Sequence, residues 1–154
     1  MPRPSLALAS AAVAALLTLP LSARAQAPDG KKVYSATCAA CHQPTGQGTS
    51  GTYPPLAGSE IVTGDEGKVI RVVLHGLTGE VEVQGETFNG AMPAWGPTLK
   101  DADIAAVLTY VRSAWGNNAA PVSAAAVAQI RAANAARKTP WTAAELAQVI
   151  PVKK

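Results

Sequence analysis

Two cysteines that are separated by two residues and followed at once by a histidine restrict this chain more than any other feature. They form the stretch C-A-A-C-H at residues 38–42 and are the only cysteines in the sequence. A thiol oxidoreductase carries the same spacing within a βαβ unit, but no such pattern surrounds this pair. Structural zinc takes four ligands, and no further cysteine is present to supply them. Neither alternative accounts for the adjacent histidine.

The same spacing is typical of covalent haem attachment. Two thiols add to the vinyl groups on one side of a porphyrin, while the imidazole of the next residue reaches the iron. A helical turn that ends at His42 achieves this, and residues 31–37 before it contain no Gly or Pro and follow Asp29, a suitable N-cap. The sequence therefore predicts one haem c, held through Cys38 and Cys41, with His42 as an iron ligand.

The ligand on the opposite side of the iron decides whether such a haem carries electrons or reacts. Met92, in G-A-M-P at residues 90–93, is the only methionine after Met1. A thioether opposite His raises the reduction potential, although a methionine can also simply fill a gap in a core. The alternative ligand is His75, the only other histidine, which we expect to donate a hydrogen bond near a haem propionate or to face solvent. We expect Met92 to bind the iron.

Four motifs stand out within residues 29–118: C-A-A-C-H at 38–42, Y-P-P-L-A-G at 53–58, G-A-M-P-A-W at 90–95 and V-L-T-Y-V-R at 107–112. With these motifs, residues 29–118 resemble a class I, cytochrome c-like monohaem domain. The resemblance implies an all-α fold in which the Pro54 carbonyl accepts the Nδ1 hydrogen of His42 and fixes its ring. It also implies that Leu56 packs on the proximal haem face and that Trp95 lies by the distal edge. Such domains transfer electrons and are not themselves enzymes.

Three further elements are predicted within this domain. Residues 66–75 carry apolar side chains at helical spacing and precede Gly76, a helix stop. Residues 80–88 alternate with period two around Gly85, which predicts a small β-hairpin like that of haem domains associated with periplasmic dehydrogenases. Residues 101–115 show the clearest apolar stripe, and this helix should cross the first one. The Gly-rich loop at 43–51 follows no strand, so it is not a phosphate-binding loop.

Beyond residue 118 the composition becomes rich in alanine. Ser123 is placed to cap a helix that runs to about Arg137, and Thr142 with Glu145 forms a capping box for another. The apolar residues of this helical C-terminal extension, residues 119–154, are too few for an independent core: Val122, Val127, Ile130, Trp141 and Leu146. We expect the extension to pack over the haem domain; the alternative is a docking element for a partner subunit.

The first 25 residues have the pattern of a cleaved secretory signal peptide. Arg3 supplies the positive start, an apolar run of about 15 residues is shorter than the roughly 20 that span a bilayer, and A-R-A at 23–25 is a cleavage pattern. We therefore expect Gln26 to begin the mature chain, the haem domain to occupy residues 26–118, and the protein to be periplasmic. Covalent attachment suits export, because the haem then cannot diffuse away.

Charge excludes nucleic acid as a partner. Removing 25 of the 154 residues leaves 129, with 11 basic and 10 acidic side chains. Residues 29–118 carry 6 basic and 9 acidic side chains, whereas residues 119–154 carry 5 and 1. With its two propionates added, the acidic haem domain should attract a redox partner that has a positive patch.

These features predict a periplasmic one-electron carrier. It would be either diffusible or the electron-accepting subunit of a periplasmic dehydrogenase, and a terminal oxidase is a further expected redox partner. The alternative is a haem enzyme or gas sensor with an open iron site, which would bind carbon monoxide readily when reduced. A thiol-disulfide protein, the third hypothesis, would contain no haem.

Overall fold

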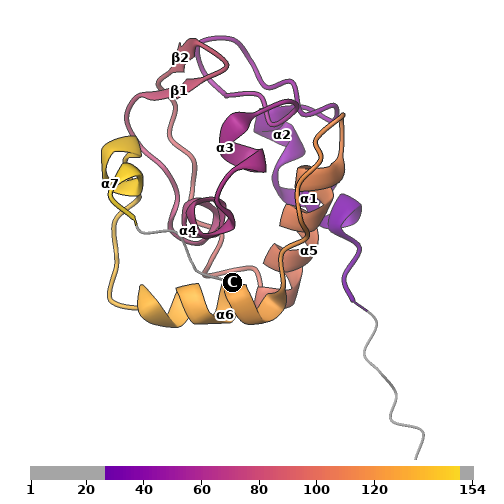
Figure 1. Cartoon of the computed structure of the whole chain (residues 1–154), viewed down its shortest axis with the longest axis vertical. Helices are drawn as coiled ribbons and strands as arrows, with labels where there is room; N and C mark the ends of the chain where they lie inside the picture. The colour runs from indigo at the N-terminus through magenta and orange to yellow at the C-terminus, as the bar shows by residue number, and fades with distance from the viewer. Residues whose placement is uncertain (1–26, 150–154) are drawn as a thin grey trace, which may run out of the picture.

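The computed structural model describes residues 27–149 (Figure 1). The predicted signal peptide at 1–25 and the last five residues lie outside this part. The elements in chain order are α1 Gly30–Thr37, α2 Ala39–His42, α3 Glu60–Thr63, α4 Glu66–His75, β1 Val81–Val83, β2 Glu86–Phe88, α5 Asp101–Ser113, α6 Ala124–Ala133 and α7 Ala143–Ala147. The predicted helical fold with one small hairpin is confirmed. None of the described helices has the length and apolar character that a bilayer span requires.

Helices α1 and α5 cross in close contact, as predicted. The Asp29 carboxylate caps α1 by accepting the backbone hydrogens of its first turn at 3.0 and 3.2 Å. At the crossing Gly30 lies against the backbone of α5, where a Cβ would overlap a carbonyl oxygen. Tyr34 packs beside Tyr110 and Trp115, with ring centroids 5.6 and 5.0 Å away.

Helix α5 ends at Ser113, two residues before the predicted end. The chain turns there because Trp115 and Gly116 both adopt positive φ, at 52° and 85°. The turn brings the aromatic ring of Trp115 back onto Tyr34. Trp115 thereby joins the apolar cluster between α1 and α5.

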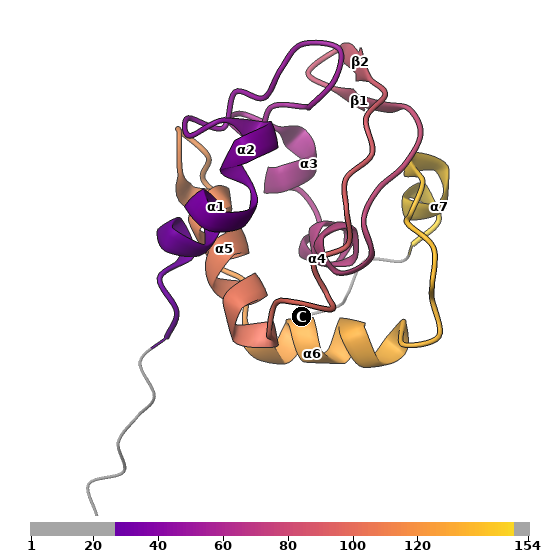
Figure 2. The same cartoon turned by 180° about the vertical axis from the view of Figure 1, so that it is seen from behind.

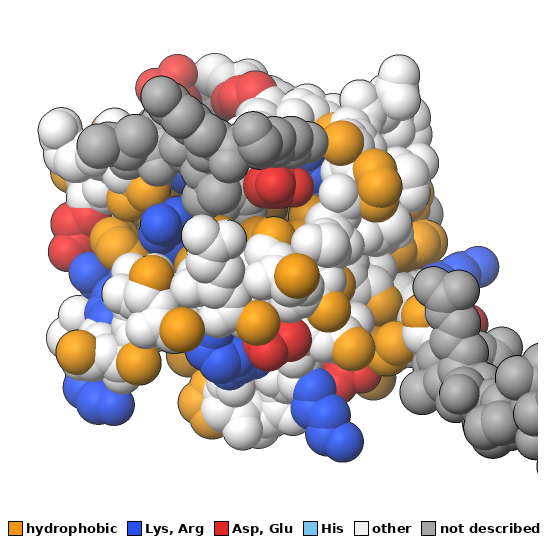
Figure 3. All heavy atoms as spheres, turned by 60° about the horizontal axis from the view of Figure 1, so that its bottom comes forward, with side chains coloured by type: hydrophobic (Ala, Val, Ile, Leu, Met, Phe, Trp, Pro, Cys, Tyr) orange, Lys and Arg blue, Asp and Glu red, His pale blue; other side chains and the backbone are white. Residues whose placement is uncertain are grey.

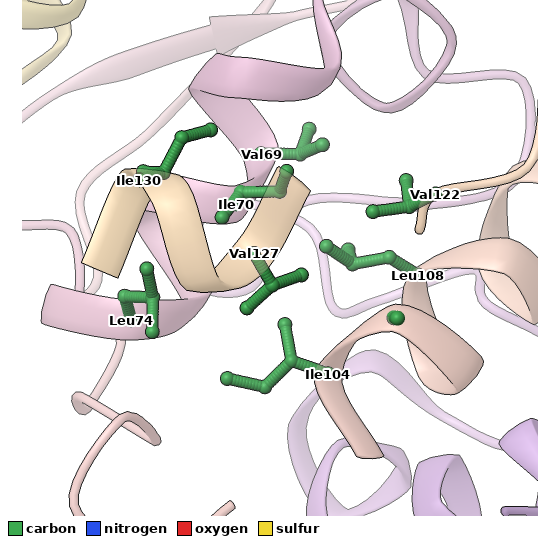
Figure 4. Close-up of a cluster of buried hydrophobic side chains, with 9 residues drawn as sticks. Val69, Ile70, Leu74, Ile104, Leu108, Val122, Val127 and Ile130 are labelled. Carbon is green, nitrogen blue, oxygen red and sulfur yellow. The ribbon is translucent and has the colours of Figure 1, made fainter. Parts of the chain in front are cut away.

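The main core lies where α4, α5 and α6 meet (Figure 4). Helix α4 begins at its N-cap Asp65 and presents one apolar face inward, as its spacing predicted. The side chains of this cluster are Val69, Ile70, Leu74, Ile104, Ala105, Leu108, Val122, Val127 and Ile130. Three of them, Val122, Val127 and Ile130, come from the extension, so the extension shares one core with the haem domain.

The hairpin forms as predicted, with its turn at Gln84 and Gly85. Val81 pairs with Phe88 and Val83 with Glu86. Both turn residues have positive φ, 54° and 76°, the conformation that a two-residue hairpin loop favours. Its apolar face is buried against Leu77 and against Ala143 of α7.

The extension passes beneath α4 and α5 as α6 and then rises to α7 below the hairpin (Figures 1 and 2). Ser123 caps α6 and the Thr142 box caps α7, as predicted. Helix α6 ends at Ala133, however, which is four residues before the predicted end at Arg137, because the Asn134 amide bonds the carbonyl of Ile130. All five of its predicted apolar residues are buried, which confirms that the extension packs over the haem domain.

On its outer side α6 exposes alanines (Figure 3). That face shows single apolar side chains distributed among Lys, Arg, Asp and Glu. Scattered apolar atoms of this kind are ordinary for a protein surface.

Candidate haem site

A break between α1 and α2 places the two cysteines and the histidine on one wall. Cys38 ends α1 and precedes α2, and its carbonyl accepts the backbone hydrogen of His42 at 3.0 Å. The two cysteines are half-buried and are not joined to each other by a disulfide. Burial raises the pKa of the Cys38 thiol, and the Thr37 hydroxyl, 3.3 Å from the sulfur, partly opposes this rise. The short helical turn that the motif predicted is therefore present.

His42 is held in one orientation by the loop at Pro54. Its Nδ1 lies 3.0 Å from the Pro54 carbonyl oxygen. Because a carbonyl only accepts, Nδ1 carries the hydrogen and Nε2 keeps a free lone pair. Burial lowers the pKa of His42, although the bond to Pro54 partly offsets this effect. The neutral ring is the form that binds a metal ion.

These groups open onto two adjoining cavities of about 260 and 80 Å³. Both cavities are lined by Cys38, His42, Pro54, Leu77, Val81 and Met92. Leu56 lines the larger one, and Cys41 and Trp95 line the smaller one. The structure thus brings every residue of the predicted site to one cleft.

The walls of the cleft are apolar and carry positive but no negative charge. Lys68 and Arg112 line the larger cavity, and no Asp or Glu is among the described residues that line either cavity. Arg112 is only 4% exposed. Its Nε donates to Ala120 and its Nη1 to the carbonyls of Val62 and Gly64, at 2.9, 2.5 and 3.1 Å. Its Nη2 has no acceptor, and the guanidinium no carboxylate partner, within residues 27–149.

Met92 enters the cleft from a loop whose backbone is bonded to the segment after α4. The Met92 amide donates to Leu77 at 2.9 Å, and the Leu77 amide donates to Met92 at 3.1 Å. The Trp95 and Gly96 amides donate to the last carbonyls of α4 at 2.9 and 3.1 Å. The position of Met92 is therefore fixed by main-chain contacts on both sides of the thioether.

His75 is the last residue of α4 and does not line either cavity. The residue is half-buried, and its Nε2 is buried without a partner in the part of the chain that the structure describes. The ring lies 6.5 Å, centroid to centroid, from the ring of Trp141, whose Nε1 is equally buried and unpartnered there. Of the two candidate ligands, Met92 is the one in the cleft.

Several wall residues carried no signal in the sequence. Leu77 and the α7 residues Ala143, Leu146 and Ala147 line the larger cavity. They come from a loop and from the extension, far along the chain from the C-A-A-C-H motif. Only Leu146, the one large apolar side chain of α7, has a residue type that indicated a buried role.

The donor set fits a haem. Two thiols, a neutral imidazole and a thioether are the groups that attach a porphyrin and bind its iron. The apolar walls suit the flat ring, and Lys68 and Arg112 suit its two carboxylates. The described residues include no group of three or more His, Cys, Asp or Glu side chains arranged to hold a bare ion.

An all-α fold built around such a cleft defines a monohaem protein of the c type. The sequence profile of the family described as Cytochrome c matches residues 27–115. The chain therefore belongs to the cytochrome c family; it binds one covalently attached haem c and transfers electrons.

Its relatives include a protein named only as a cytochrome and proteins named as subunits of larger enzymes. Cytochrome c-552 of Thermus thermophilus is 49% identical over 107 residues, which cover 67% of this chain and 70% of the relative. The fructose dehydrogenase cytochrome subunit of Gluconobacter japonicus is 40% identical over 112 residues, 68% of this chain but 22% of the relative. The cbb3-type cytochrome c oxidase subunit CcoP of Azospirillum brasilense is 32% identical over 98 residues, 60% and 30% of the two chains.

Proposed function

We propose that this protein is a periplasmic one-electron carrier, not an enzyme, whose haem iron is bound by His42 and Met92. The observation that carries this proposal is that both side chains and both thiols line one cleft, whereas His75 lies outside it. A filled sixth position leaves no place for a substrate or gas on the iron. This favours electron transfer over an open-site haem enzyme or gas sensor.

Each residue of the site then has a defined role. Cys38 and Cys41 would form the two thioether bonds, and the Nε2 of His42 would bind the iron while the Pro54 carbonyl holds the ring. The Met92 sulfur would bind the opposite face, with Leu56 and Trp95 packed beside the ring. When bound, the haem supplies a one-electron couple between ferric and ferrous iron. Because His42 and Met92 are both held by main-chain contacts, they would keep their positions in both oxidation states and little rearrangement would accompany transfer.

The partner would approach at the mouth of the smaller cavity. Ala91 and Pro93 beside Met92 and Ala40 beside Cys41 are exposed apolar residues. A small apolar rim supports the brief, weak contacts of electron-transfer partners. The relatives named as dehydrogenase and oxidase subunits favour a periplasmic dehydrogenase as donor and a terminal oxidase as acceptor, and the c-552 relative favours a diffusible form.

Export accounts for the first 25 residues. A signal peptide cleaved after A-R-A would release a chain that begins at Gln26. N-terminal sequencing of the haem protein purified from a periplasmic extract tests this, and haem protein found only in the cytoplasm with an intact leader would contradict it.

The ligand proposal is tested with Met92→Ala and, as its matched control, His75→Gln. The oxidised wild-type protein should show the weak sulfur–iron absorption band and, once reduced, bind carbon monoxide poorly. Met92→Ala should lose the band, bind carbon monoxide readily and have a lower reduction potential, while His75→Gln should behave as the wild type does. If His75→Gln opens the iron instead, the ligand is His75; if the wild type already binds carbon monoxide readily, the site is open.

A further inference from the structure

The backbone around Met92 is bonded to the C-terminal extension through one shared residue. Leu77 pairs with Met92 on one side and with Trp141 on the other. The Trp141 amide donates to Gly76 at 3.0 Å, and the Thr78 amide donates to Trp141 at 2.8 Å. Three distant segments of the chain thus form one small ladder, and the extension is its outer member.

Arg131 of α6 makes a second connection to the same loop. Its Nη1 donates to the Gly96 carbonyl at 2.6 Å and its Nη2 to the Leu99 carbonyl at 2.9 Å. Its Nε donates to the Asp101 carboxylate at 2.7 Å, which forms an ion pair at the start of α5. The side chain is about one-third exposed, so its planar fork is held in a partly desolvated position.

The loop contains no regular structure, so apart from its main-chain bonds to Leu77 and to the last turn of α4 it depends on these contacts. Most residues between Met92 and α5 are exposed to solvent. The exposed residues are Pro93, Ala94, Pro97, Thr98 and Lys100. Its internal bonds join only Trp95 to Thr98 and Leu99. Few buried apolar contacts and few internal bonds are the marks of a segment that opens easily.

We propose that the C-terminal extension is a clasp for the Met92 loop, with Arg131 as its positioning residue. The proposal rests on Met92 as the sixth ligand. A neutral thioether stays on the iron only while its loop stays in place. The fraction of molecules in which Met92 is bound therefore depends on the contacts that hold the loop. Arg131 contributes two charge-assisted bonds to carbonyls of that loop, and Trp141 secures Leu77, which holds the other end. The extension would therefore set how rarely the iron loses its sulfur.

The first test compares Arg131→Ala with Arg71→Ala in the haem-loaded full chain. Arg71 is a matched control because its guanidinium donates to Gly67 within α4 and not to the loop. Arg131→Ala removes both charge-assisted bonds to the loop, and we expect carbon monoxide to bind the reduced protein at least about tenfold faster. When the pH of the oxidised protein is raised, the variant should lose its sulfur–iron band about one pH unit below the pH at which the wild type loses it. Arg131→Lys, which keeps the charge but not the fork, should recover part of both changes.

The second test uses the wild type alone and remains valid if Arg131→Ala does not fold. Hydrogen exchange should show that the amides of Met92 and Trp141 exchange through one opening event, with protection factors within about threefold of each other. Protection of Met92 that is independent of Trp141 would overturn the proposal. So would an Arg131→Ala protein with wild-type carbon monoxide binding, or one whose changes Arg71→Ala reproduces. A wild type without any sulfur–iron band would instead disprove ligation by Met92, and the clasp with it.

Discussion

Gly76 and Met92 are in backbone contact: the Met92 carbonyl oxygen occupies the space into which a side chain at position 76 would project. Gly76 ends α4 with φ at 83°, a conformation that L side chains rarely adopt. The end of α4 and the Met92 loop can therefore be in direct backbone contact only because Gly76 has no Cβ.

We predict that Gly76→Ala displaces the Met92 loop. Gly79→Ala is the matched control, since Gly79 has nearly the same φ, 80°, but no atom within 4 Å of a built Cβ. The control should lose about 1 to 2 kcal/mol of unfolding free energy from the positive φ alone. Gly76→Ala should lose a further ~1 to 3 kcal/mol from overpacking and should weaken the sulfur–iron band. Urea unfolding and the absorbance of the oxidised protein measure both, and equal losses in the two variants would contradict the prediction.

Arg112 should keep the reduction potential independent of pH near neutrality. A buried cation beside a haem propionate holds that carboxyl ionised and favours ferrous iron. Arg112→Met should therefore lower the potential and make it depend on pH, by up to about 59 mV per pH unit where one proton accompanies each electron. Redox titration between pH 5 and pH 8 measures this.

Lys68→Met is the control for Arg112, since Lys68 lines the same cavity but is half-exposed and more strongly screened. It should shift the potential less. Arg112→Lys, which retains the charge, should keep the wild-type pH profile even if it loses stability with its bonds to Val62 and Gly64. A folded Arg112→Met protein with a flat pH profile would show that the propionates lie elsewhere.

His75 should make the protein less stable in mild acid. Burial and then four nearby positive charges lower its pKa; these belong to Arg137, Arg131, Arg71 and Lys138. The unfolded chain protonates this group near its ordinary pKa of about 6.5, so its contribution is complete above that pH and is lost as the pH falls below it. His75→Gln should therefore lose less stability than the wild type between pH 7.5 and pH 5.5. Urea unfolding at the two pH values tests this, and equal losses would assign the acid sensitivity to another group.

Local sequence determined most of the site. We predicted the site residues from three local features: the C-A-A-C-H spacing, the loop at Pro54 and the single internal methionine. Each feature is contained within a few positions of the chain. The stripes of α4 and α5 identified the core for the same reason. These signals depend on periodicity and residue type, both of which are readable without tertiary structure.

What the sequence did not reveal depends on contacts between distant segments. Nothing local distinguishes Leu77 from other apolar loop residues, yet it joins Met92 to Trp141. Arg112 stands in a recognised motif, but its burial follows from the approach of Val62 and Ala120. The end of α6 was predicted too late because alanines beyond Asn134 favour a helix, whereas the tertiary path toward Trp141 requires the chain to leave it.

The order of the cleft residues along the chain has a consequence for maturation. Cys38 and Cys41 come early in the described part of the chain, and α7, near its end, supplies the last residues that line the cleft. A porphyrin captured at those thiols can act as a template on which the following hundred residues condense. Without the porphyrin, the same apolar lining would surround water, and the chain would lose much of the apolar burial that favours folding. We therefore expect haem attachment and folding to be coupled, with the thioether bonds forming before the rest of the chain folds.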